Sequence, residues 1–162
     1  QAVAAGFYEK ALLISILKLK HVPFVPRTLG ESITAAALRL EPESETVIIP
    51  VPLSERRRRE RGFNQSELLA RFVASKLGLS LNLTSLKRVS QIKMSRAGMD
   101  RKSRHESVGK AFQVNGPKLI EGKSILLIDD VFTSGATVSS CAKVLKEAGA
   151  KSVMVLTAAR AG

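Results

Sequence analysis

The stretch Ile125-Leu-Leu-Ile-Asp-Asp-Val-Phe-Thr-Ser-Gly-Ala-Thr137 decides how this chain folds. With Ser124 it begins as an apolar run typical of a buried strand, and residues 129–133 are expected to form a turn. A helical stripe of apolar residues follows over 138–148, and residues 152–157 are the next predicted strand. Strand, helix and strand with short connections predict a βαβ unit, and hence a parallel sheet with helices on its faces.

Two adjacent carboxylates, Asp129 and Asp130, come at the carboxyl end of that strand, where open α/β sheets bind ligands. Small or hydroxylated residues then begin the predicted helix: Thr133, Ser134, Gly135, Ala136 and Thr137. Such a turn offers an anion backbone N–H groups and the positive end of a helix dipole, and Gly135 allows close approach to the backbone. The pattern predicts a cradle for a phosphate monoester, with the acids placed to accept hydrogen bonds from the hydroxyls of an attached sugar.

Two other interpretations fit these residues less well. Paired acids after an apolar strand are also typical of the Mg-binding strand of nucleoside triphosphatases, but that class requires a G-x-x-x-x-G-K-[ST] loop, which this sequence lacks. In the purely structural interpretation, Asp129 forms a turn and Thr133 caps a helix. That interpretation does not explain why so many neighbouring residues suit one ligand.

Positive charge is concentrated in the middle of the chain. The 162 residues include 26 Lys+Arg and 14 Asp+Glu, a net charge of +12, and residues 51–110 hold 15 of the basic and 5 of the acidic side chains. A field of that sign attracts phosphates, pyrophosphate or nucleic acid, and the alternative is a solvated basic face. Charge alone does not choose among these partners.

Composition excludes several classes of protein. A chain of this length, 44% hydrophobic and 25% charged, indicates a single globular domain over residues 1–162. Its apolar runs are too short for a transmembrane helix, so we expect no membrane partner. One cysteine, Cys141, allows neither an intrachain disulfide nor a cysteine-rich zinc site. With no signal-peptide pattern visible, these features favour a cytoplasmic location.

The remaining elements are predicted from periodicity and turn residues. Apolar spacing favours helices over 9–19 and 31–40, and residues 46–51 form a β-branched strand. A basic loop is expected over 53–63, and Asn64 with Glu67 resembles the capping box of the next helix. A short strand is expected over 79–83. Residues 86–110, which are basic and rich in serine, are expected to form a long exposed loop or hairpin.

Residues 125–137 resemble the phosphoribosyl-pyrophosphate (PRPP) signature of type I phosphoribosyltransferases. Further segments resemble the ComF-type branch, which is linked to competence for DNA uptake, and the similarity runs from about residue 7 to residue 159. These segments are Val51-Pro-Leu-Ser54, Arg61-Gly-Phe-Asn-Gln65, Leu68-Leu-Ala-Arg71 and Ala111-Phe112. The resemblance implies the Rossmann-like α/β fold of that family, a parallel sheet with helices on both faces and a small hood, here residues 7–30.

The resemblance also implies roles for individual residues. Asp129 and Asp130 would bind the ribose hydroxyls as the catalytic pair and contact Mg²⁺ only indirectly, through PRPP, while the five residues from Thr133 to Thr137 would bind the 5′-phosphate. Pyrophosphate would be held by Pro52, Leu53, Arg59, Arg61 and Gly62. Residues 86–110 would be a mobile loop that closes over the reacting centre, with Arg88, Lys93, Arg96 and Arg104 as its candidate ligand contacts.

Two functions therefore stand side by side. The first is a PRPP- and Mg-dependent transferase that releases pyrophosphate to an unknown nitrogen acceptor. A purine-salvage acceptor is disfavoured, because such members carry an acid where this chain has Thr133. The second is a non-catalytic competence protein that retains the pocket and binds single-stranded DNA on residues 51–110, although few aromatic side chains are available for base stacking. A homodimer is a further assembly that the sequence leaves open.

Overall fold

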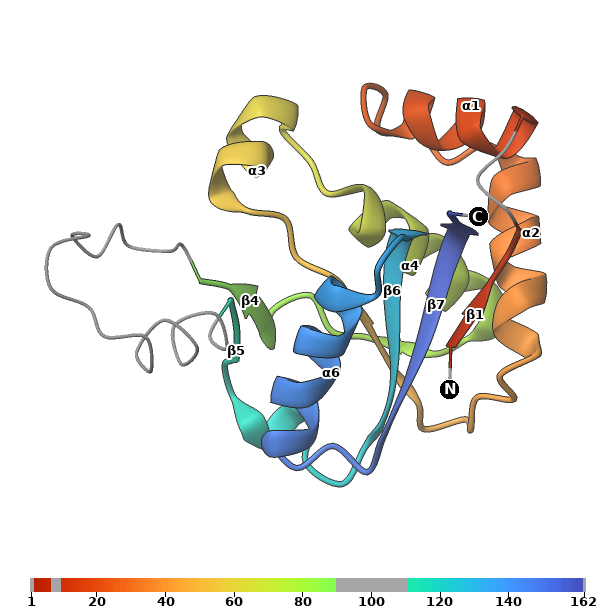
Figure 1. Cartoon of the computed structure of the whole chain (residues 1–162). Helices are drawn as coiled ribbons and strands as arrows, with labels where there is room; N and C mark the ends of the chain where they lie inside the picture. Colours follow the sequence, from red (N-terminus) through yellow and green to blue (C-terminus); the bar gives the residue numbers. More distant parts are fainter. Residues whose placement is uncertain (1, 7–9, 90–110, 162) are drawn as a thin grey trace, which may run out of the picture.

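The computed structural model describes residues 2–6, 10–89 and 111–161. Its centre is a five-stranded sheet in the order β1-β7-β6-β2-β3, in which every neighbouring pair is parallel (Figure 1). An antiparallel pair, β4 and β5, forms a separate small sheet. The strands are β1 (Ala2–Ala4), β2 (Val47–Pro50), β3 (Ser80–Leu81), β4 (Leu86–Arg88), β5 (Phe112–Val114), β6 (Ser124–Phe132) and β7 (Ser152–Arg160).

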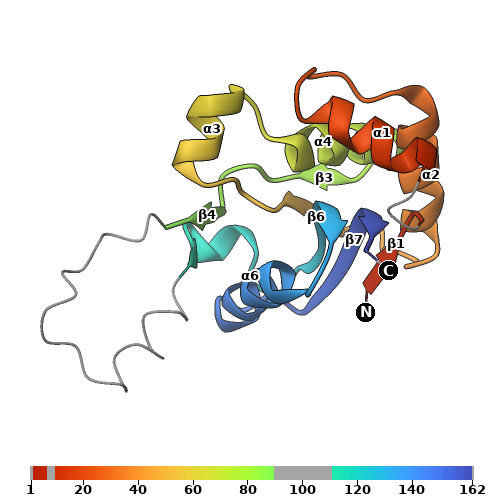
Figure 2. The same ribbon diagram turned by 45° about the horizontal axis from the view of Figure 1, so that its top comes forward.

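Helices cover both faces of the large sheet, as predicted (Figure 2). Leu126 and Ile128 of β6 pack with the helices on one face, and Ile125 and Leu127 pack on the other face, because successive side chains of a strand point to opposite sides. The first face carries α1 (Lys10–Leu19), α2 (Arg27–Leu38) and α4 (Gln65–Leu77). The second carries α6 (Ala136–Glu147), β5 and Ile120, the residue after the 3-10 turn η1 (Pro117–Leu119). Within the described ranges, no helix has the length and apolarity to cross a bilayer.

The predicted βαβ unit is confirmed as β6, α6 and β7, but its first turn was placed wrongly. β6 runs on to Phe132, so Asp129 and Asp130 lie in the strand and not in a turn. The reason is that β7 continues beside it, pairing Thr157 with Asp129 and Arg160 with Phe132. The turn is confined to residues 133–135.

The predicted basic loop is also wrong in part, because it contains the helix α3 (Glu55–Arg61). Ser54 caps its first turn by accepting a hydrogen bond from the N–H of Arg57 at 3.3 Å. Gly62 ends it in the left-handed conformation, at φ +78°. Ion pairs one helical turn apart join Arg56 to Glu60 and Arg59 to Glu55. None of its residues is buried, and it projects from the body of the protein (Figure 1).

The start of α2 and the segment after β3 also differ from what the sequence predicts. α2 begins at Arg27 and not at residue 31, directly after Pro26, and Arg27 forms an ion pair with Glu31 at 2.7 Å. The segment 86–110, expected to be a long exposed loop or hairpin, begins with the strand β4, which pairs with β5 beyond the end of that segment. Lys93, Arg96 and Arg104 lie outside the described residues.

Candidate functional site

The two acids lie at the carboxyl end of β6, against the first turn of α4. Ser66 donates its hydroxyl to Oδ1 of Asp129 at 3.0 Å, and Gln65 donates its side-chain amide to Oδ2 of Asp130 at 3.2 Å. The backbone N–H of Asp130 donates to Oδ1 of Asp129, at 2.9 Å. From the end of α1, the ammonium of Lys20 approaches Asp130 to 3.9 Å. The backbone N–H of Val131 donates to Oδ1 of Asp130 at 2.8 Å. The acid pair is therefore surrounded by two side chains of α4, two backbone N–H groups of β6 and the ammonium of Lys20.

The surroundings of Asp129 oppose its ionisation. Burial raises its pKa from the ordinary 3.8 to about 7, and the neighbouring negative charge of Asp130 acts in the same direction. Hydrogen bonds from the Asp130 N–H and the Ser66 hydroxyl counteract part of that effect. The acid pair can thus be an acceptor for hydroxyl groups and also a place where a proton is held near neutral pH.

The predicted phosphate cradle follows directly after β6. Gly135 occupies the left-handed region at φ +75°, and a Cβ at this position would lie 2.8 Å from the ring of Phe132. Thr133, Ser134, Ala136 and Thr137 are exposed, and the N–H of Ala136 donates to the Ser134 hydroxyl at 3.4 Å. The start of α6 therefore faces solvent, where an anion could reach it. The structure thus brings the acids and the cradle together as consecutive parts of one strand, turn and helix.

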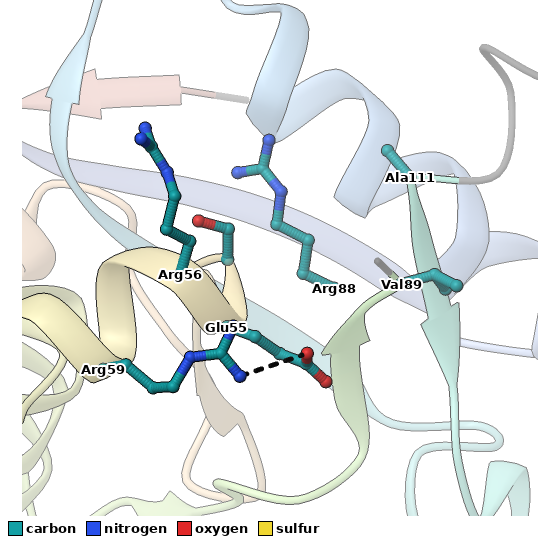
Figure 3. A pocket seen from close by; sticks show the side chains of 7 residues that line it. Glu55, Arg56, Arg59, Arg88, Val89 and Ala111 are labelled. Carbon is teal, nitrogen blue, oxygen red and sulfur yellow. Dashed lines mark ion pairs between the residues drawn. The ribbon is translucent and has the colours of Figure 1, made fainter. Parts of the chain in front are cut away.

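A second anion-attracting feature is a cleft of about 360 Å³ between α3 and the β4–β5 hairpin. Figure 3 shows the side chains of Arg56 and Arg88 extending on the same side of the cleft, while Arg59 turns toward Glu55. Arg88 also lies over the ring of Phe112, with its guanidinium carbon 5.3 Å from the ring centre. The lining residues are Ser54, Glu55, Arg56, Arg59, Arg88, Val89 and Ala111.

The residues predicted to bind pyrophosphate are not all at this cleft. Arg59 lines it, but Arg61 and Gly62 close the far end of α3 and are not among its lining residues. Pro52 and Leu53 are half-buried in the connection from β2 to α3. Arg88, predicted as a loop contact, shares the cleft with Arg59. The arginine run is divided because a helix turns successive side chains by about 100°.

A family model describing the phosphoribosyl transferase domain matches residues 64–162, which include the acid pair and the cradle. A relative named Competence protein F, from Haemophilus influenzae, is 31% identical over 170 residues, covering 98% of this chain and 72% of its own length. The chain belongs to the ComF-type phosphoribosyltransferase-like family.

Other ComF-type relatives match over a shorter stretch. The DNA utilization protein YhgH of Salmonella typhi is 34% identical over 108 residues, and Competence protein ComFC of Bacillus subtilis is 33% identical over 116 residues. The matches cover 67% and 68% of this chain, but 46% and 42% of those two proteins. This chain therefore spans less than half of the length of these relatives.

Solved structures agree on the fold of this ComF-type chain. The allosteric regulatory enzyme of purine biosynthesis superposes with a TM-score of 0.56 at 22% identity, over 80% of this chain and 24% of that one. Glutamine PRPP amidotransferase from B. subtilis superposes with a TM-score of 0.55 at 21% identity, and the match covers 78% of this chain and 24% of that one. A hypoxanthine-guanine phosphoribosyltransferase from Bacillus anthracis superposes with a TM-score of 0.51 at 16% identity, and the match covers 80% of this chain and 66% of that one. At these identities the likeness establishes the type I phosphoribosyltransferase fold.

The donor groups of this ComF-type site suit Mg²⁺ only in part. Mg²⁺ prefers oxygen ligands and usually keeps several waters or substrate oxygens while using one or two carboxylates. Asp129 and Asp130 supply two carboxylates, and in the described ranges no three His, Cys, Asp or Glu side chains gather into a metal cage. The residues therefore fit a magnesium ion held mainly through a substrate.

Several residues of this site are not predictable from the sequence patterns described above. Gln65 is recognised only as part of the segment that resembles the family, and no role is predicted for Ser66, Arg56 or Lys20. No sequence signal marks Gln65 and Ser66, because polar residues are ordinary at the start of a helix and their burial, to 3% exposure, depends on how α4 packs. The position of Lys20 depends on how α1 packs, which periodicity does not reveal.

Proposed function

We propose that this chain is a PRPP- and Mg-dependent phosphoribosyltransferase. The observation that carries the proposal is the pair Asp129 and Asp130 at the end of β6, directly followed by an exposed turn and the start of α6. Such a series offers acceptors for hydroxyl groups followed directly by an anion cradle, the two kinds of group that ribose 5-phosphate requires. The matched family domain, residues 64–162, supports the same ligand.

In this proposal the chain binds and orients its substrate and supplies no nucleophile of its own. The N–H groups and hydroxyls of residues 133–137 bind the 5′-phosphate, and Asp129 and Asp130 accept hydrogen bonds from the ribose hydroxyls. As a nitrogen acceptor attacks C1 of the ribose, the bond to pyrophosphate breaks and negative charge collects on the leaving group. Guanidinium groups of Arg56 and Arg88 would stabilise that charge. Mg²⁺, when bound with PRPP, would neutralise part of it.

Calorimetric titration with PRPP and Mg²⁺ tests the proposal. The wild type is expected to bind, and Asp130→Ala and Asp129→Ala should weaken binding about 10- to 100-fold, because each removes a charged hydrogen-bond acceptor. Glu67→Gln is the matched control, since Glu67 pairs with Arg71 on the exposed side of α4. Absence of PRPP binding by the wild type would refute the proposal. If the wild type binds PRPP, a panel of amines and nucleobases, assayed for pyrophosphate release, would identify the acceptor.

A second candidate function is binding of single-stranded DNA. It is favoured by α3, whose four consecutive arginines from Arg56 to Arg59 are all exposed on a projecting helix. The names Competence protein F and DNA utilization protein, borne by relatives, favour the same partner. Binding driven by phosphate contacts weakens steeply as salt increases. Anisotropy titrations of a labelled oligonucleotide at several salt concentrations are expected to show that slope, and a flat response would exclude this mode.

A further inference from the structure

The first turn of α4 makes one hydrogen bond to each acid, from two consecutive residues. Gln65 donates to Asp130 at 3.2 Å and Ser66 donates to Asp129 at 3.0 Å. Both donors are buried to 3% exposure, so water competes little for these bonds. Each carboxylate therefore has its own donor on a rigid element outside β6.

This turn is itself fixed to the sheet. Asn64 accepts a hydrogen bond from the N–H of Ser66 at 3.2 Å and donates its amide to the carbonyl of Val51 at 3.0 Å. The N–H of Val51 donates to the carbonyl of Ile128, the residue before Asp129, at 2.8 Å. The chain of bonds thus returns to β6 and closes a ring. A closed ring leaves the donors little freedom to move relative to the acids.

Gln65 is a poor choice for stability alone. Its amide oxygen is buried and accepts no hydrogen bond from the described residues. A buried acceptor without a partner is destabilising, whereas an apolar side chain of similar length would avoid that cost. The benefit of glutamine at this position must therefore come from the N–H group that contacts Asp130.

We infer that Gln65 and Ser66 are positioning residues that hold the carboxylates of Asp130 and Asp129 in the orientation that receives the ribose hydroxyls. The ligand named here rests on the proposed function, but the hold on the acids does not. The two residues act through the acids and need not touch the substrate. Their role belongs to α4, an element outside the strand, turn and helix that form the cradle.

The hold on the acids is testable without a ligand. In wild-type protein labelled with ¹⁵N, the side-chain amide of Gln65 is expected to resonate away from the solvent-exposed amides and to shift in Asp130→Asn. In protein labelled with ¹³C, the carboxyl resonance of Asp129 should move in Ser66→Ala and return toward its wild-type position in Ser66→Thr, which restores a hydroxyl. An unchanged Gln65 amide resonance in Asp130→Asn, together with an unchanged Asp129 carboxyl resonance in Ser66→Ala, would overturn the inference.

The consequence for binding is tested with PRPP and Mg²⁺ by calorimetry, together with melting temperatures. Gln65→Met and Ser66→Ala should each weaken PRPP binding about three- to tenfold, the effect of one lost hydrogen bond, and Ser66→Thr should restore it. Gln65→Met should melt no lower than the wild type, because it removes the unpaired oxygen. Glu67→Gln is the control on the same helix.

The two proposals fail in distinguishable ways. Wild-type protein that binds no PRPP refutes the proposed function, while the ligand-free resonances still decide whether α4 holds the acids. Wild-type protein that binds PRPP, with unchanged affinity in Gln65→Met and Ser66→Ala, refutes the positioning role alone. The role is likewise refuted if affinity falls only in step with melting temperature across the variants.

Discussion

Asp129 has a carboxyl group that is buried beside a second carboxyl group, and both circumstances raise its pKa, to about 7. In the unfolded chain the same group has the ordinary value of 3.8. Between these two values the folded protein binds more protons than the unfolded one, so the free energy of unfolding falls as the pH rises from about 4 to about 7. The contribution of Asp129 is then constant above that range.

Replacing Asp129 by Asn should remove this dependence, because an amide cannot ionise. Relative to the wild type, the free energy of unfolding of the variant is expected to rise by about 1–4 kcal/mol between pH 4 and pH 8, since each pKa unit corresponds to about 1.4 kcal/mol. Urea unfolding at a series of pH values measures the difference. Glu67→Gln should run parallel to the wild type, and a wild-type profile identical in shape to that of Asp129→Asn would contradict the expectation.

Gly135 offers a second test on single residues. Alanine there must adopt φ +75°, at a cost of about 1 kcal/mol, and its Cβ would lie 2.8 Å from the Phe132 ring. We expect Gly135→Ala to lower both the free energy of unfolding and the affinity for PRPP. Urea unfolding and calorimetry measure the two effects.

Gly122 supplies the matched control for that experiment. It has a similar φ of +69°, but a Cβ there would have no neighbour within 4 Å. Gly122→Ala should therefore lower the free energy of unfolding by a similar backbone cost, while its affinity for PRPP stays unchanged. Equal affinities for both variants would argue against a role of the 133–135 turn in phosphate binding.

At the scale of elements, prediction from sequence depended on which forces shape each segment. β2, β6, β7 and α6 were predicted because burial imposes a pattern of apolar residues, which is visible over residues 124–148. The three-residue strand β1 is too short to show such a pattern and was not predicted. α3 has no buried face, so periodicity could not reveal it. Its signals were local: Ser54 as a cap, Gly62 as a stop, and Glu55 and Arg59 spaced one turn apart. These signals were hidden by the arginine run, which suggested a loop.

The contact between α2 and α4 allows a prediction about helix packing. A Cβ on Gly30 would lie 2.3 Å from the ring of Phe72, so the two helices meet through a glycine and an aromatic ring. Gly30→Ala should destabilise the protein by about 1–3 kcal/mol through overpacking, despite the better helix propensity of alanine. Urea unfolding measures the change.

A second substitution distinguishes overpacking from other causes. Phe72→Leu removes the ring, and in that background Gly30→Ala should cost less than in the wild type, or become stabilising. Ser32→Ala, on the exposed side of α2, is the control for helix propensity. A Gly30→Ala variant as stable as Ser32→Ala would show that α2 shifts without cost.

At the scale of the whole molecule, the sequence predicted the parallel sheet and the strand that ends in the acids. It did not predict which basic residues line the cleft and which lie beside the acids. The division depends on tertiary packing: the cleft is formed by α3 and by β4, which lie far apart in sequence, and includes Arg56, Arg59 and Arg88. Helical spacing relates Arg56 to Arg59, but no spacing rule relates either of them to Arg88. Lys20 reached the acids for the same reason, through the packing of α1.

This cleft predicts a stabilising ligand. A ligand that binds only the folded state raises the melting temperature, so pyrophosphate should raise that of the wild type. The rise should be smaller in Arg88→Gln and Arg56→Gln, and unchanged in Arg57→Gln, because Arg57 lies on the same helix but does not line the cleft. Scanning fluorimetry measures the shifts. Equal rises in all four proteins would indicate that pyrophosphate binds elsewhere.

The pairing of β1 with β7 sets an order of events during synthesis. Ala2 aligns with Val155, so the segment made earliest among the described residues finds its place only against one of the last. Closing so long a loop is slow, and it cannot start until the late strand has left the ribosome. This edge of the sheet is thus completed only after β7 has been made, whereas β2, β3 and α4 can associate before that.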